Sequence, residues 1–301
     1  MEVLVQPLNR VIRVEPGANL LEALQAAQVP MSYSCMAGRC GYVLACGTYI
    51  TEPCTIEIPE PDEVVVHPAR IIKATVTAIE DMTHDIKRLL LKPAKPLEFS
   101  PGQYVQLQFT PDHARPYSMA ALCTDGQLEF HVRLVPDGRV TGRIARDLKP
   151  GDSVRVSGPL GSAYLRRKHD GPMLCVAGGT GLALILSILR GAVAAGMRNP
   201  IHLYVGVRSP RDVYGRAWLA QLQREHPSLK VHVVVSSGGD PRTQRCGLVI
   251  EAIEQDLGDL AGWRAYLCGS PPMVESAMLV ARRKGLAPEH VYADAFYPQG
   301  S

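Results

Sequence analysis

Met173-Leu-Cys-Val-Ala-Gly178-Gly-Thr-Gly-Leu182-Ala-Leu-Ile-Leu-Ser-Ile-Leu189 is a run of 17 residues without a charged side chain. Its beginning suits a buried strand and its end a buried helix. The glycine-rich tetrapeptide between them interrupts the run, which is also slightly short for a membrane-spanning helix. A buried strand, a glycine turn and a buried helix therefore explain the run better than a membrane span.

Strands and helices alternate around this run from residue 171 to residue 301, which predicts an α/β domain with a doubly wound parallel sheet. The expected strands are 173–177, 201–207, 231–236 and 264–267. The expected helices lie near 182–196, 213–225, 247–256 and 272–284. Ligands of such sheets bind beyond the carboxyl ends of the strands, which is where the glycine turn lies.

Residues 69–168 carry a β pattern instead and predict an antiparallel β-barrel. The candidate strands are short, at 73–79, 86–91, 104–109, 128–132 and 153–156. Turn dipeptides such as Pro101-Gly102 and Pro150-Gly151 separate them. One helix is expected at about 140–147.

The N-terminal 68 residues predict a third, small and strand-rich domain, in which Asn19 can cap a helix over 20–28. A cysteine-rich loop follows. Cys35 and Cys40 have the C-x4-C spacing that opens a plant-type [2Fe-2S] loop, but the third ligand should be residue 43, which is Val43.

Charge is unevenly spread along the 301 residues. The net charge is +3, and the first 68 residues hold three basic against eight acidic side chains. This acidic part is either a solvated surface or a docking face for a basic partner. No basic run interleaves with aromatic residues, so we expect no nucleic-acid partner. Eight cysteines without a visible signal peptide indicate reduced thiols or metal ligands and a cytoplasmic protein.

Arg115-Pro116-Tyr117-Ser118 is the first candidate site. A flavin requires a cation for its pyrophosphate, an aromatic side chain beside its ring and a hydroxyl near the nitrogen that receives hydride. On a strand, Arg115 and Tyr117 share one face while Ser118 points the other way. Alone, the tetrapeptide also fits an ordinary surface strand.

Three further stretches could contact a nucleotide. Gly138-Arg-Val-Thr141 opens a predicted helix whose free N–H groups suit a phosphate, or it is a turn with a threonine cap. The turn Gly178–Gly181 lets the backbone approach an anionic ligand, although it lacks the G-x-G-x-x-G pattern and could be a tight packing turn. Cys268-Gly269 ends the last predicted strand, where a lone cysteine is otherwise a small buried hydrophobe.

Taken in order, these motifs resemble the ferredoxin–NADP⁺ reductase superfamily. The closer resemblance is to the NADH-dependent reductase components of naphthalene-type and salicylate-hydroxylating ring-hydroxylating dioxygenases, and it spans essentially the whole chain. The segments that carry it are Met31–Cys35, His67–Lys73, Phe99–Tyr104, Ala114–Ala120, Gly171–Cys175, Ala261–Gly269 and Tyr292–Pro298.

This resemblance implies a [2Fe-2S] β-grasp domain over 1–68, an FAD-binding barrel over 69–168 and an NAD(P)-binding α/β domain over 171–301. It implies flavin contacts at Arg115, Pro116, Tyr117, Ser118, His131, Val132 and Arg133, and pyrophosphate contacts at Gly138, Arg139, Val140 and Thr141. It places the nicotinamide nucleotide at Gly178, Gly179, Thr180, Gly181, Gly206, Arg208, Asp212, Cys268 and Gly269. At the reacting centre it places Ser118, Cys268 and Phe296.

Three details refine these expectations. Phe296 would cover the flavin and move aside for nicotinamide. Asp212 suits an NADH-type ribose pocket, while Arg208 and Arg211 leave NADPH possible. The family has proline where this chain has Leu184, and the loss of a first-turn proline loosens the adjacent turn, which predicts weakened use of NADH.

The larger departure from the family lies between Gly41 and Tyr42, where roughly thirty residues that include the third cluster ligand are missing. The resemblance leaves Cys35, Cys40 and Cys46 as cluster ligands, an incomplete set, on a truncated domain.

The function that we predict is electron transfer. Hydride passes from NADH to FAD, and single electrons pass through the [2Fe-2S] centre to a Rieske-type ferredoxin of an aromatic-ring dioxygenase. One alternative is a flavin-only NADH diaphorase with a non-functional cluster domain. A weaker one is a scaffold in which the N-terminal cysteines, Cys54 included, bind zinc.

Overall fold

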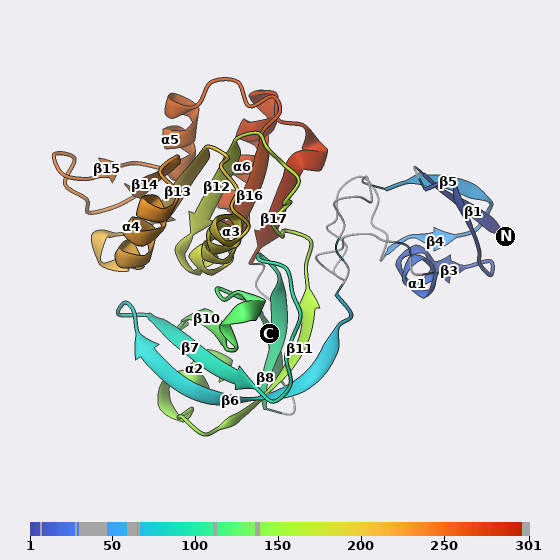
Figure 1. Ribbon diagram of the computed structural model, residues 1–301, viewed down its shortest axis with the longest axis horizontal. Helices are drawn as coiled ribbons and strands as arrows, with labels where there is room; N and C mark the ends of the chain where they lie inside the picture. The colour runs from blue at the N-terminus through green and yellow to red at the C-terminus, as the bar shows by residue number, and fades with distance from the viewer. Residues whose placement is uncertain are drawn as a thin grey trace. The chain divides into compact units, whose positions relative to one another are not determined.

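The computed structural model describes residues 1–6, 8–27, 29, 47–58, 65, 67–110, 113–135 and 139–296. It divides into two compact units, Met1–Val66 and His67–Ser301 (Figure 1). The second unit contains both of the large sheets. No helix among the described residues is long and apolar enough to cross a bilayer.

The N-terminal unit is built around β1, which pairs antiparallel with β2 and parallel with β5. The element bounds are β1 (Glu2–Gln6), β2 (Arg10–Arg13), β3 (Ala18–Asn19), α1 (Leu20–Ala26), β4 (Tyr49–Ile50) and β5 (Cys54–Glu57). Oδ1 of Asn19 accepts hydrogen bonds from the backbone N–H groups of Leu21 and Glu22, at 3.0 and 3.2 Å, which confirms the predicted helix cap.

The barrel is a curled sheet of six antiparallel strands in the order β10-β7-β6-β11-β8-β9. Its elements are β6 (Arg70–Asp81), β7 (Ile86–Pro93), β8 (Tyr104–Thr110), β9 (His113–Ser118), η3 (Cys123–Asp125), β10 (Leu128–Arg133), α2 (Arg139–Arg146) and β11 (Ser153–Leu160). An antiparallel bridge between Met119 and Phe130 joins the two edges of the sheet. Alternate apolar residues of the strands fill the interior.

The second sheet is parallel throughout, in the order β15-β14-β13-β12-β16-β17. Its strands are β12 (Met173–Gly178), β13 (Ile201–Val207), β14 (Leu229–Val235), β15 (Arg245–Cys246), β16 (Arg264–Gly269) and β17 (Val291–Ala295). The helical elements are η4 (Gly179–Gly181), α3 (Leu182–Ala194), η5 (Pro210–Asp212), α4 (Arg216–Glu225), α5 (Val249–Asp256), α6 (Pro271–Arg283) and η6 (Pro288–His290). Core residues of α3 and α4 cover one face, and those of α5 and α6 cover the other, so the predicted doubly wound fold is confirmed.

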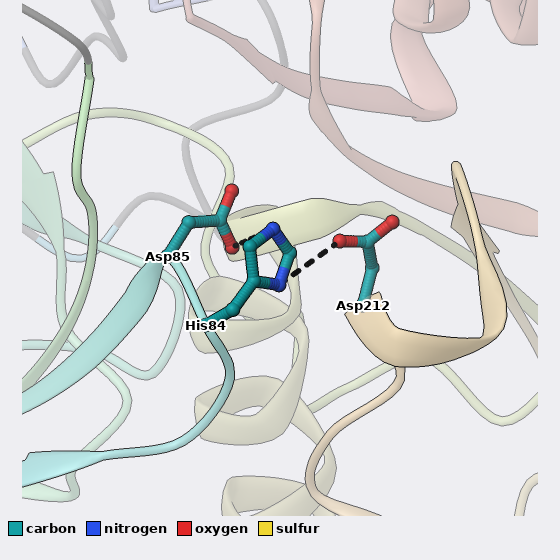
Figure 2. A group of neighbouring side chains, drawn as sticks. All are labelled: His84, Asp85 and Asp212. Atoms are coloured by element: carbon teal, nitrogen blue, oxygen red, sulfur yellow. Dashed lines mark ion pairs between the residues drawn. The ribbon is translucent and has the colours of Figure 1, made fainter.

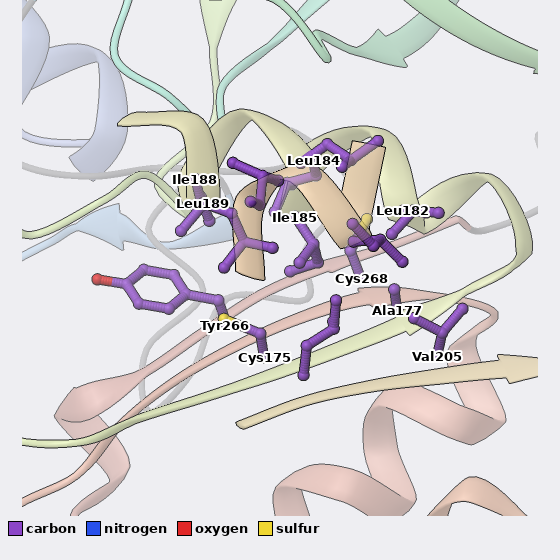
Figure 3. Close-up of a cluster of buried hydrophobic side chains, with 14 of the residues drawn as sticks. Cys175, Ala177, Leu182, Leu184, Ile185, Ile188, Leu189, Val205, Tyr266 and Cys268 are labelled. Atoms are coloured by element: carbon purple, nitrogen blue, oxygen red, sulfur yellow. The ribbon is translucent and has the colours of Figure 1, made fainter. Parts of the chain in front are cut away.

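Helix α3 is apolar except for Ser187 and Arg190 because it is buried on two sides. Its leucine and isoleucine side chains pack on Cys175, Tyr266 and Cys268 of the sheet (Figure 3). On its other side Ser187 donates a hydrogen bond to the carbonyl oxygen of Ala121 in the barrel, at 2.8 Å. The helix therefore ties the barrel to the α/β sheet, and the glycine turn at its start lies where the two meet.

Candidate active site

The glycine turn Gly178–Gly181 joins β12 to α3 and has a predicted nucleotide-contact residue on each side. The register places Gly206 of β13 beside it on one side and Cys268 of β16 on the other. A Cβ added to Gly181 would lie 2.2 Å from the carbonyl oxygen of Cys268, which no real side chain tolerates. The turn therefore requires glycine there, and its main chain lies directly on the end of β16.

Ser118, at the end of β9, meets two residues of the α/β domain. Its Oγ donates a hydrogen bond to Oδ2 of Asp294 at 3.0 Å. Asp294 of β17 pairs in register with Cys268 of β16. The structure thus brings together Ser118 and Cys268, both predicted at the reacting centre, and adds a carboxyl group that the sequence interpretation missed.

Burial governs the protonation of this group. It raises the pKa of Asp294 to about 6, and the hydrogen bond from Ser118 offsets only part of that rise. Burial, together with the nearby Asp294 charge, raises the pKa of the Cys268 thiol well above its usual value. The thiol of Cys268 is therefore neutral at neutral pH. Asp294 titrates at a pH slightly below neutral.

Phe296 lies at the same end of the sheet. Its backbone N–H donates to the carbonyl oxygen of Gly269 at 2.8 Å. Gly269 has a φ of +152°, and a Cβ there would lie 3.0 Å from the backbone of Gly178. Gly269 therefore borders the glycine turn, and Phe296, which is 38% exposed, lies beside Gly269.

Arg115 and Tyr117 lie on one face of β9 as the alternation predicted, because they pair with Leu107 and Val105 of β8. The Tyr117 ring packs edge-on against Phe109, with 6.3 Å between centroids. Burial raises the pKa of Tyr117 to about 12, so its hydroxyl remains a neutral donor. Pro116, between the two, is exposed.

The three flavin-contact candidates on β10 have different surroundings. Val132 is fully buried in the barrel core, whereas His131 and Arg133 face outward. Nε of Arg133 is 3.3 Å from Oδ2 of Asp85, and its guanidinium lies against Gly179. His131 is buried against the α/β domain, with its side chain hydrogen-bonded to Tyr214 and Glu129.

The predicted pyrophosphate stretch is described in part. Gly138 lies outside the described residues, while Arg139, Val140 and Thr141 form the first turn of α2. Oγ1 of Thr141 accepts from the N–H of Val135 at 3.2 Å and donates to the carbonyl oxygen of the same residue at 3.3 Å. This hydroxyl therefore fixes the chain that enters the helix.

Asp212 belongs to a cluster with His84 and Asp85 (Figure 2). Its Oδ2 accepts from the N–H and the hydroxyl of Ser209, both at 2.7 Å, and its Oδ1 is 3.8 Å from Nδ1 of His84. Nε2 of His84 is 3.8 Å from Oδ1 of Asp85.

This cluster links the barrel, which carries His84 and Asp85, to the α/β domain, which carries Asp212. Burial opposes ionisation of Asp212, but the Ser209 hydrogen bonds and the charges of His84 and Arg133 lower its pKa overall. Arg133 also neutralises Asp85. A cation therefore already stands at the site. Arg208 and Arg211 are exposed nearby, with no carboxylate partner among the described residues.

Comparison with known proteins assigns the family. Residues 73–164 match the oxidoreductase FAD-binding domain family and residues 175–278 the oxidoreductase NAD-binding domain family. Over the full length of both chains, the protein is 55% identical to a Ralstonia protein described as the ferredoxin–NAD(P)⁺ reductase component of naphthalene 1,2-dioxygenase/salicylate 5-hydroxylase systems. The chain belongs to this reductase family. A Pseudomonas putida reductase component of a naphthalene 1,2-dioxygenase system is 54% identical, also over the full length.

The fold of this reductase also matches a solved relative. The crystal structure of the Amycolatopsis cytochrome P450 reductase GcoB superposes with a TM-score of 0.81 at 33% identity, covering 99% of each chain. The recognised family, the fold class and the assignment as a flavin- and NAD-binding oxidoreductase are confirmed.

The predicted iron–sulfur ligands lie in a part of the reductase that the structure does not describe. Cys35, Cys40 and Cys46 lie outside the described residues, as does the junction between Gly41 and Tyr42. The alignments with the two relatives run over 327 positions, 26 more than the 301 residues of this reductase. The relatives therefore hold residues that this chain lacks.

Sequence interpretation missed three residues that the structure brings to the site: Asp294, Tyr214 and His84. Asp294 stands two residues before Phe296 within a segment already singled out. Tyr214 stands two residues after Asp212. A search for polar residues within two positions of each predicted contact would have found both.

Proposed function

We propose that this reductase takes hydride from NADH onto FAD and passes single electrons through a [2Fe-2S] centre to a Rieske-type ferredoxin of an aromatic-ring dioxygenase system in the cytoplasm. The observation that carries the proposal is the meeting of Ser118, Asp294 and Cys268 where the barrel touches the α/β domain. The proposed domains are 1–68, 69–168 and 171–301.

The residues present fit the two nucleotides. The barrel offers Arg115 for a pyrophosphate, the half-buried Tyr117 ring for a flavin and the first turn of α2 for phosphate oxygens. The glycine turn offers main-chain groups at the start of α3, and close packing of Gly181 on the Cys268 carbonyl holds it in place. The flavin supplies the chemistry of accepting an electron pair and releasing electrons singly; the protein binds, orients and excludes water.

Ser118, Cys268 and Asp294 have distinct proposed roles. Ser118 places a hydroxyl at the junction, where its O–H donates to Asp294 and its oxygen can still accept a hydrogen bond. Cys268 is neutral, so it contributes shape and an apolar surface rather than charge. Asp294 titrates at about pH 6 and can hold or release a proton one hydrogen bond from Ser118.

Asp212 and its neighbours bear on the choice of nucleotide. We propose that Asp212 accepts a hydrogen bond from the ribose of NADH, because it follows β13 and its lowered pKa keeps it ionised. The exposed Arg208 and Arg211 would accept the additional phosphate of NADPH, so weaker NADPH use accompanies NADH use. Leu184, at the position where the family has proline, is fully buried in the core. We still expect the loss of that proline to weaken the use of NADH.

The cluster decides between the proposed function and its main alternative. Cys35, Cys40 and Cys46 would hold a [2Fe-2S] centre together with a fourth ligand, and that centre would supply one-electron transfer to a Rieske centre, downhill from about −400 mV to roughly −150 to +300 mV. Without the cluster, the same flavin chemistry makes a diaphorase that reduces small acceptors. A zinc scaffold would have no NADH chemistry.

Two measurements on the FAD-loaded full chain test these functions. NADH-dependent reduction of ferricyanide is expected, and its absence would contradict the flavin assignment. After dithionite reduction, a low-temperature EPR signal with stoichiometric iron and sulfide is expected. Ferricyanide reduction without that EPR signal would contradict the cluster and favour the flavin-only diaphorase alternative.

A further inference from the structure

A chain of hydrogen-bonded side chains runs from the barrel to the glycine turn. Nε2 of His131 is 3.2 Å from Oε1 of Glu129, its neighbour on the outer face of β10. Nδ1 of His131 is 3.0 Å from the hydroxyl oxygen of Tyr214, which lies between η5 and α4. That hydroxyl is 3.3 Å from the carbonyl oxygen of Gly179.

The imidazole of His131 is fixed by packing as well as by hydrogen bonds. The residue is 4% exposed and Tyr214 is 7% exposed. The ring stacks on Trp218 of α4, with 5.7 Å between centroids, and meets the Tyr214 ring edge-on at 5.3 Å. Buried polar networks whose members all have partners hold their groups in one arrangement. His131 and Tyr214 are therefore held in one arrangement relative to each other.

The charged groups around the imidazole of His131 determine which of its nitrogens carries a hydrogen. Arg88 donates from Nε and Nη2 to both carboxylate oxygens of Glu129, each at 2.9 Å. Burial works against ionisation of Glu129, but the hydrogen bonds from His131 and Arg88 lower its pKa to about 2. Burial lowers the pKa of His131, so the ring is neutral at neutral pH.

A neutral imidazole carries one N–H, and the carboxylate of Glu129 requires it. Nε2 of His131 therefore donates to Glu129, and Nδ1 accepts from Tyr214. The Tyr214 hydrogen is shared between this nitrogen and the more distant carbonyl oxygen of Gly179.

We propose that His131 is a positioning residue for the nicotinamide-binding turn, acting through Tyr214 on Gly179. The proposal rests on the proposed function, which assigns Gly178–Gly181 to the nicotinamide nucleotide. Gly179 has a φ of +55°, and Arg133 covers the place where its Cβ would be. The barrel thus contacts the turn through Arg133 directly and through His131 by way of Tyr214.

Steady-state oxidation of NADH with ferricyanide, by the FAD-loaded full chain, tests this role. Tyr214→Phe removes the hydroxyl, and His131→Phe removes both ring hydrogen bonds while an aromatic ring remains on Trp218. A net hydrogen bond corresponds to a change of about three- to tenfold in an equilibrium. Each variant is expected to raise the KM for NADH by that factor, and Tyr214→Phe, which lies outside the proposed flavin contacts, should do so with kcat within about twofold and flavin content unchanged.

Two further variants separate positioning from general destabilisation. The double variant His131→Phe/Tyr214→Phe is expected to raise KM no more than the larger single change, because both act through one connection. His131→Gln can donate to Glu129 and accept from Tyr214, so its KM should stay within about twofold of the wild type.

Tyr204→Phe is the matched control. Its hydroxyl donates to Oδ2 of Asp256 at 3.0 Å, and its ring packs on the opposite face of the same sheet. It loses a comparable tyrosine hydrogen bond, and KM should not change. Unchanged KM in both single variants, multiplicative effects in the double variant, or no rescue by glutamine would each overturn the proposal. No NADH oxidation by the wild type would contradict the proposed function instead.

Discussion

Asp294→Asn should stabilise the α/β domain at alkaline pH and leave its stability unchanged in acid. The native pKa of Asp294 is about 6, whereas an unfolded aspartate titrates at about 3.9. Because the native pKa is raised, the stabilising contribution of the protonated form is complete below about pH 4 and is lost as the pH rises through 6. The shift of about two units corresponds to about 3 kcal/mol, and less after local relaxation.

Asparagine resembles the protonated acid and does not titrate. We therefore expect the variant to exceed the wild type in free energy of unfolding by up to about 3 kcal/mol at pH 8, and by close to nothing at pH 4. Both tryptophans, Trp218 and Trp263, lie in the α/β domain, so tryptophan fluorescence during urea unfolding reports on this domain.

Asp170→Asn, at an exposed position of the same unit, is the control and should show no such pH dependence. The reasoning is refuted if Asp294→Asn is less stable than the wild type at pH 8, or if the difference between the two is the same at both pH values.

Three other results are expected. Gly181→Ala places a Cβ 2.2 Å from the carbonyl oxygen of Cys268, and should abolish NADH oxidation and cost more than about 3 kcal/mol in urea unfolding; near-native values of both would contradict the packing. Ellman's reagent should label Cys54, Cys123 and Cys246 in the native protein, and Cys175 and Cys268 only after unfolding; fast native labelling of the last two would refute their burial. The lowered pKa of His131 means that this residue binds more protons in the unfolded chain below about pH 6.5, so its own contribution to stability is lost as the pH drops below that value; the stability of His131→Gln relative to the wild type should therefore rise as the pH drops, as urea midpoints would show.

The elements that follow from local pattern could be predicted from the sequence. The glycine turn, α3 and the strands on either side have periodicity and turn residues of their own. The apolar run from residue 173 predicted a buried helix because α3 packs on the sheet and on the barrel at once. The edge strands β15 and β17 were missed, since β15 has two residues and the half-buried β17 shows no alternation.

The contacts that complete the site could not be predicted, because they join distant parts of the chain. Ser118 and Asp294 are 176 positions apart, and His131 and Tyr214 are 83 apart. Nothing within a window of one strand indicates that Asp294 faces a serine or that Tyr214 faces a histidine. Likewise, strand alternation places His131 outside the barrel but cannot say that the α/β domain covers it.

The proposed function places the reduction of the flavin by NADH where Ser118 meets Cys268 and Asp294. Anaerobic rapid mixing of NADH with the FAD-loaded protein measures this step through the loss of oxidised flavin absorbance. Ser118→Ala removes the hydroxyl at the proposed reacting centre together with its hydrogen bond to Asp294, and loss of a hydrogen-bonding group at a reacting centre can cost about 100-fold. We predict a decrease of about that size with flavin still bound. Flavin reduction at the wild-type rate in this variant would contradict the account.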